Sequence, residues 1–95
     1  PVVEQAVKES DEVIVRMTVA PGSEFDGVTL GAREVKTETG MRIIAVRRSR
    51  GGERDWVIQP GPETELLAGD VFIAKGTRSG AERLAALTGS EYSSE

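Results

Sequence analysis

Five arginines gather in one short stretch of the chain, around a glycine pair. They are Arg42, Arg47, Arg48, Arg50 and Arg54, with Gly51-Gly52 between the last two. A guanidinium group presents paired N–H donors that match the oxygens of a phosphate. The cluster therefore predicts a site for an anion or a nucleotide phosphate. The alternative is a solvated hairpin tip whose charges discourage edge-to-edge pairing, which fits Arg50 and Arg54 best.

Most classes of catalytic chemistry lack their usual residues in this chain. Histidine and cysteine are both absent, which excludes a Ser-His-Asp triad, a thiol nucleophile, a thiolate metal site and a disulfide. No carboxylate pair shows a recognisable acid–base spacing. We therefore expect neither an enzyme nor a cofactor. We also expect no metal site, because Asp70 lies in a turn without EF-hand spacing and should hydrogen-bond nearby backbone.

The overall charge limits the partners. The chain has 95 residues and a net charge of −4, which argues against a nucleic-acid polymer as partner. No apolar run approaches the roughly 20 residues that cross a bilayer. We expect a cytoplasmic protein that reaches a membrane only through a partner or through further segments of its own chain.

The arginines are positioned by a predicted hairpin over residues 41–62. In the first strand, Met41, Ile43 and Ala45 are expected on one face, and Ile44 and Val46 on the other. A strand that is apolar on both faces should be covered on both. One cover is the domain's own core, and the second is a helix or a partner chain. Ile43, Ile44, Val46 and Ile58 accordingly form a ligand groove, a dimer seam or ordinary core.

The remaining elements suit a small α+β domain. Residues 12–19 and 71–76 read as strands, and Phe25 is the expected anchor of the first loop. A short helix should begin at Leu30, capped by Thr29 and stopped by Gly40. A second helix should begin at a capping box formed by Ser79 and Glu82 and end at Gly89.

These elements follow the order β-α-β-β-β-α, which predicts a mainly antiparallel sheet with two short helices. We expect residues 1–11 to be a linker or the end of an upstream helix. Residues 12–89 should form the domain, and residues 90–95 a polar tail.

Four motifs, in this order and spacing, resemble a known family. They are Thr29-Leu30-Gly31, the apolar strand that ends in Arg47-Arg48, Pro60-Gly61-Pro62, and Leu67-Ala68-Gly69-Asp70 before a strand that ends at Gly76-Thr77. Together they are similar to the TrkA C-terminal domain, the C-terminal lobe of the regulator-of-potassium-conductance module. The nucleotide-binding Rossmann lobe of that module has no counterpart here, because no strand is followed by G-x-G-x-x-G.

The resemblance implies a regulatory domain of a potassium channel or transporter system. It implies a homodimer, a membrane channel, a transporter or an upstream PhoU-like domain as partner, and a small ligand such as a cyclic dinucleotide or a divalent ion. The expected ligand-binding residues are Ile43, Ile44, Arg47, Arg48, Ile58 and Pro60. The alternative is a structural dimerisation domain that binds no ligand.

Overall fold

The computed structural model describes residues 12–48, 56–90 and 93–94. In chain order, these residues form β1 (Val13–Thr18), β2 (Val28–Thr29), α2 (Val35–Thr39), β3 (Met41–Arg47), β4 (Trp56–Ile58), β5 (Glu65–Leu66), β6 (Val71–Gly76), α3 (Arg78–Thr88) and β7 (Ser93–Ser94). The expected hairpin turn and the expected upstream linker lie outside the described residues.

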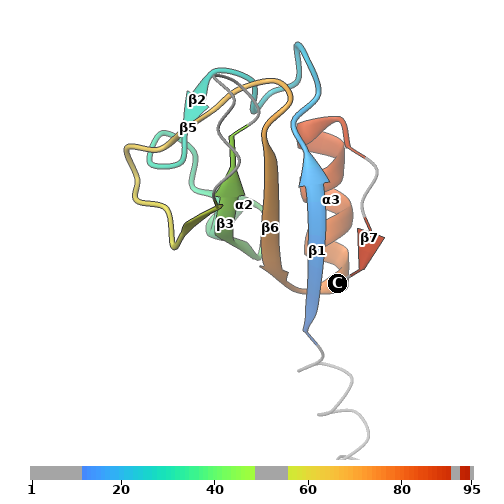
Figure 1. The fold of residues 1–95 in the computed structure, drawn as a ribbon. Coiled ribbons are helices and arrows are strands. Elements are labelled where there is room, and N and C mark those ends of the chain that lie inside the picture. The colour runs from blue at the N-terminus through green and yellow to red at the C-terminus, as the bar shows by residue number, and fades with distance from the viewer. Residues whose placement is uncertain (1–11, 49–55, 91–92, 95) are drawn as a thin grey trace, which may run out of the picture.

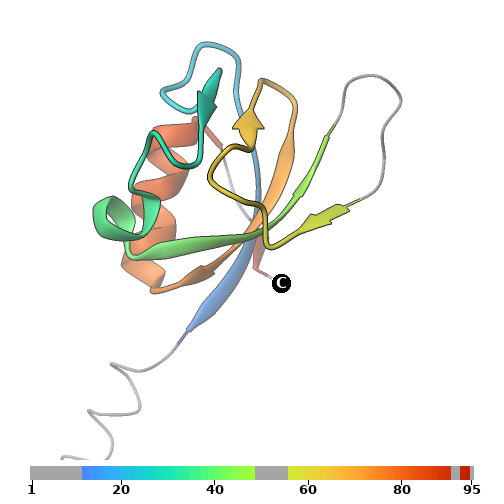
Figure 2. The ribbon, with the colours of Figure 1, turned by 90° about the vertical axis from the view of Figure 1, so that its left-hand side faces the viewer.

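One antiparallel sheet organises the domain, with strand order β4-β3-β6-β1-β7. A separate two-stranded ribbon pairs β2 with β5. Both helices lie on the same side of the five-stranded sheet, as the edge-on view in Figure 2 shows, and α3 runs behind β1 in Figure 1. The predicted small α+β domain, a mainly antiparallel sheet with two short helices, is confirmed.

The core fills the space between the sheet and the helices. In β1, Val15 and Met17 are buried while Arg16 between them is exposed, which is the alternation expected of a strand with one covered face. The other fully buried apolar side chains come from β3, β5, β6, α3 and the loops, and they include Val19, Phe25, Met41, Val46, Leu66, Phe72, Ala74, Ala81 and Leu84. Phe25 is therefore the loop anchor that the sequence predicts.

A β-bulge in β3 corrects the predicted assignment of faces. Ile43 pairs with Ala74, but the next pair is Ala45 with Ile73, so Ile44 is an extra residue in β3. An extra residue shifts the alternation by one position. Val46 consequently joins Met41 and Ile43 in the core, fully buried, and Ala45 turns to the opposite face. Val46 therefore belongs to neither a groove nor a seam.

The first helix is shorter than predicted. It begins at Val35, and Thr29 instead caps a turn, because its Oγ1 accepts from the backbone N–H of Ala32 at 3.2 Å. The backbone N–H of Gly31 donates to the carbonyl oxygen of Pro62 at 2.8 Å. An added Cβ at Gly31 would lie 2.9 Å from that carbonyl oxygen. This close approach holds the chain in a turn. Gly40 ends the helix in the left-handed region, φ 79°, as predicted.

Arg33 fixes the turn before α2. Its guanidinium donates to both carboxylate oxygens of Glu38, at 2.8 and 3.1 Å, and its Cζ lies 5.0 Å from the centre of the Phe25 ring. The hydrogen bond to Glu38 raises the pKa of Arg33. A bidentate pair of this kind restricts the geometry more than a single charge contact does.

The N-terminal cap of α3 also differs from the prediction. Thr77 is the N-cap, and its Oγ1 accepts from the backbone N–H of Gly80 at 2.9 Å, so Ser79 and Glu82 do not form a capping box. Gly89 ends the helix with φ 69°, as predicted. The expected backbone contact of Asp70 is confirmed as well, since its Oδ2 accepts from the N–H of Leu67 at 3.0 Å.

The caps can be tested by a matched pair of substitutions. Thr77→Ala should lower the free energy of unfolding by about 1 kcal/mol, because it leaves the N–H of Gly80 without its acceptor. Ser79→Ala should change it by less than about 0.5 kcal/mol, because Ser79 is exposed and makes no cap contact. Urea unfolding measures both values. Equal losses would contradict the assignment of Thr77 as the cap.

Candidate ligand-binding and dimerisation surface

The side of the sheet away from the helices is here called the open face. Strand alternation and register assign to it Ile14, Arg16 and Thr18 of β1, Val71, Ile73 and Lys75 of β6, Arg42, Ala45 and Arg47 of β3, and Trp56 and Ile58 of β4. No helix formed by the described residues covers this face (Figure 2). Ile58 is 67% exposed and Ile14 is 39% exposed. The open face thus combines exposed apolar side chains with basic ones.

A groove of about 670 Å³ crosses the open face at the bulge. Its lining residues are Arg42, Ile43, Ile44, Ala45, Ile58, Gln59, Pro60, Ile73 and Lys75. The groove opens here because β4 pairs with β3 only from Ala45 to Arg47. Beyond that pairing the N–H of Gln59 donates to the carbonyl of Ile44 at 2.8 Å, with Gln59 at φ 51°. A left-handed non-glycine residue beside a groove is typical of functional sites.

The floor of the groove is apolar and one end is basic. Ala45 is only 5% exposed because it lies between Ile58 on β4 and Ile73 on β6 in the register. Arg42 and Lys75 are directly opposite each other on neighbouring strands at the basic end. Lys75 Nζ lies 3.5 Å from Glu12 Oε1, and both side chains are substantially exposed. The groove can therefore hold a flat apolar group and an anion together.

The sequence profile of the TrkA-C domain matches residues 14–89. The chain belongs to the TrkA-C domain family. The resemblance noted in the sequence is thereby confirmed. No curated protein sequence matches the chain.

Solved structures with the same fold include RCK_C domains. The RCK_C domain dimer of S. agalactiae BusR in complex with c-di-AMP is 22% identical with a TM-score of 0.70, over 81% of this chain and 90% of that one. The RCK C domain of the potassium transport protein KtrA, also in complex with c-di-AMP, is 23% identical with a TM-score of 0.64, over 87% and 91%. At this level of identity the likeness establishes the fold.

Longer structures contain the same fold as one part. The GsuK RCK domain is 24% identical with a TM-score of 0.66, over 92% of this chain. This TrkA-C domain spans only 18% of that GsuK chain, and 36% of the chain of S. agalactiae BusR in complex with its busAB-promoter DNA.

Four of the six predicted ligand-binding residues of this TrkA-C domain line the groove. They are Ile43, Ile44, Ile58 and Pro60. Arg47 lies on the open face beyond the groove, with its Cζ 5.4 Å from the centre of the Trp56 ring. Arg48 follows the end of β3, and its Nε is buried with no hydrogen-bond partner among the described residues. Arg50 and Arg54 lie outside the described residues.

Five groove residues were not among the six predicted ligand-binding residues, although Arg42 belongs to the predicted arginine cluster. They are Arg42, Ala45, Gln59, Ile73 and Lys75. Strand alternation in residues 71–76 could have placed Ile73 and Lys75 together on one face. Ala45 was hidden by the bulge, and nothing local in the sequence announces the left-handed conformation of Gln59.

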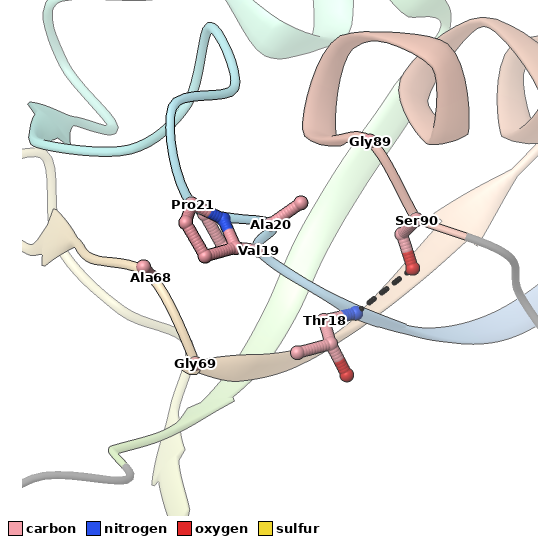
Figure 3. Close-up of a pocket in the computed structure, with 8 residues that line it drawn as sticks. All are labelled: Thr18, Val19, Ala20, Pro21, Ala68, Gly69, Gly89 and Ser90. Atoms are coloured by element: carbon pink, nitrogen blue, oxygen red, sulfur yellow. Dashed lines mark hydrogen bonds between the residues drawn. The ribbon is translucent and has the colours of Figure 1, made fainter.

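A second hollow of this TrkA-C domain lies at the C-terminal end of β1. It has a volume of about 640 Å³ and is lined by Thr18, Val19, Ala20, Pro21, Ala68, Gly69, Gly89 and Ser90 (Figure 3). The backbone N–H of Thr18 donates to Ser90 Oγ at 3.0 Å within it. None of its lining residues is charged, so the hollow offers little for recognising an ionic ligand.

Two features are absent from the described residues. These residues include no group of three or more carboxylate, imidazole or thiol side chains that could hold a metal ion. They also form no helix that is long and apolar enough to cross a membrane.

Proposed function

We propose that this TrkA-C domain is a cytoplasmic, non-catalytic regulatory domain that dimerises through its open face and binds a cyclic dinucleotide in the groove. The observation that carries the proposal is the groove itself, which joins an apolar floor to basic side chains on a sheet face that no described helix covers. Two structures of the same fold hold c-di-AMP, and one of them is a dimer.

The groove residues suit the two parts of such a ligand. Ile44, Ile58 and Pro60 provide apolar contacts against the flat faces of the bases, and Ile43 supports them from the core. Arg47 and Arg48 provide guanidinium groups for phosphate oxygens near the end of β3.

The regulatory effect follows from differential affinity. A ligand that binds one dimer geometry better than another shifts the population towards that geometry and biases whatever the domain is attached to. The attached part is, in our proposal, a potassium channel or transporter, as in GsuK. The second candidate is a DNA-binding regulator, because the BusR structure with its promoter DNA contains the same fold. A ligand-free structural dimer is the remaining alternative.

Calorimetry with c-di-AMP and with calcium tests the proposal. We expect binding of c-di-AMP and a loss of affinity of about 100-fold in the double variant Arg47→Ala/Arg48→Ala, since each charge-assisted contact is worth roughly 1.5–3 kcal/mol. The matched control Arg78→Ala/Arg83→Ala removes two exposed arginines of α3 and should leave the affinity unchanged. Absence of heat with c-di-AMP and with calcium would leave only the structural dimer.

A further inference from the structure

The basic end of the groove places two positive charges side by side. Arg42 of β3 and Lys75 of β6 are register partners, and both line the groove. Like charges at directly opposite positions of an antiparallel pair destabilise it. Glu12 approaches Lys75 at 3.5 Å, but its side chain is 60% exposed, so solvent screens the pair strongly. No ion pair to Arg42 is found among the described residues.

A dimer through the open face would double this charge. Two identical faces meet isologously, so each copy brings its own Arg42 and Lys75 to the seam. Besides Arg42 and Lys75, the open face carries Arg47, and Glu12 lies beside Lys75. Removing water from such a seam strengthens repulsion between like charges. The apolar residues favour association of two copies, whereas the basic residues oppose it.

We propose that Arg42 and Lys75 form an anion-binding pair that makes dimerisation of this domain dependent on a phosphate ligand. The inference rests on the proposed function, because it takes the second copy of the chain as the occupant of the open face. An anion between the two copies neutralises the pair and permits the apolar surfaces to close. The dimer then forms tightly only with ligand, and the ligand binds tightly only to the dimer.

Sedimentation equilibrium of the chain, with and without c-di-AMP, tests this inference. In the wild type we expect c-di-AMP to lower the dimer dissociation constant by at least about 10-fold. Without ligand, 500 mM NaCl should lower it by about 3-fold relative to 50 mM, because salt screens the repulsion. Arg42→Gln should strengthen the ligand-free dimer by about 5-fold and remove most of the response to c-di-AMP and to salt. Lys75→Gln should likewise strengthen the ligand-free dimer and reduce its response to c-di-AMP and to salt.

The controls separate this inference from the proposed function. Arg83→Gln removes one positive charge from the exposed side of α3 and should leave every dissociation constant unchanged. Unchanged thermal unfolding midpoints establish that the variants are folded. The inference alone is overturned if the dissociation constant of the wild-type dimer changes with neither salt nor c-di-AMP. It is also overturned if the Arg42→Gln variant keeps the full response to c-di-AMP. A monomer under all conditions overturns the inference and the proposed dimer together.

Discussion

Replacing Gly76 with alanine should remove a large part of the stability of the domain. Gly76 ends β6, and an added Cβ would lie 2.3 Å from the carbonyl oxygen of Gly40 and 2.6 Å from Met41 Sδ. The oxygen belongs to the backbone that joins α2 to β3, so it cannot move without shifting both elements. We expect a loss of about 3 kcal/mol or more, measured by urea unfolding. That is a large share of the 5–15 kcal/mol typical of a domain.

Gly22 supplies the control for this substitution. It has φ 77°, but an added Cβ would meet nothing within 4 Å. Gly22→Ala should therefore cost about 1 kcal/mol, from backbone strain alone. If both alanine variants lost the same stability, the tight contact at Gly76 would not be the cause.

Ile58→Asp should strongly weaken dimerisation while leaving the fold intact. Ile58 is 67% exposed in the protomer, so its loss removes little buried surface on folding. In the proposed dimer, however, an aspartate at position 58 would place a carboxylate against the apolar floor of the groove. We expect the dimer dissociation constant to rise by about 100-fold, the size of effect seen when a central interface residue is lost. Sedimentation equilibrium measures it.

Val57 provides the matched control for Ile58. It is the preceding residue of β4, is 44% exposed, and pairs with Val46 on the helix side of the sheet. Val57→Asp introduces the same charge on the opposite face and should change the dissociation constant by less than about 3-fold. Equal weakening by both substitutions would point to damage of β4 and not to a contact through the open face.

The strands β1, β3, β4 and β6 and their order along the chain could be predicted because their physics is local, whereas the two-residue strands β2, β5 and β7 were not predicted. Alternation in residues 13–19 identified β1 and its buried face, and glycines at positions 40 and 89 correctly marked the helix ends. The bulge at Ile44 could not be predicted in this way. It depends on how β3 pairs with both β4 and β6, and the four successive apolar residues from Ile43 to Val46 suit either register.

The candidate site was predictable to a lesser extent than the fold. The four apolar groove residues follow from the hairpin and the family motifs. The pairing of Arg42 with Lys75 joins residues 33 positions apart, and it exists only because β6 lies beside β3 in the sheet.

The cap of α3 was predicted at Ser79 because the spacing of Ser79 to Glu82 fits a common capping motif. Thr77 has the extended backbone that a cap requires, with φ −87° and ψ 157°.

The place of β1 within the sheet has a mechanical consequence. It lies between β6 and β7, and its six residues all pair with β6, from Val13 opposite Gly76 to Thr18 opposite Val71. Ile14 is the partner of Lys75, so the chain enters the sheet at the same end as the basic part of the groove. Tension along β1 would load all of these ladder bonds in shear. Because the groove lies on the same sheet, any displacement of the sheet would displace the groove with it.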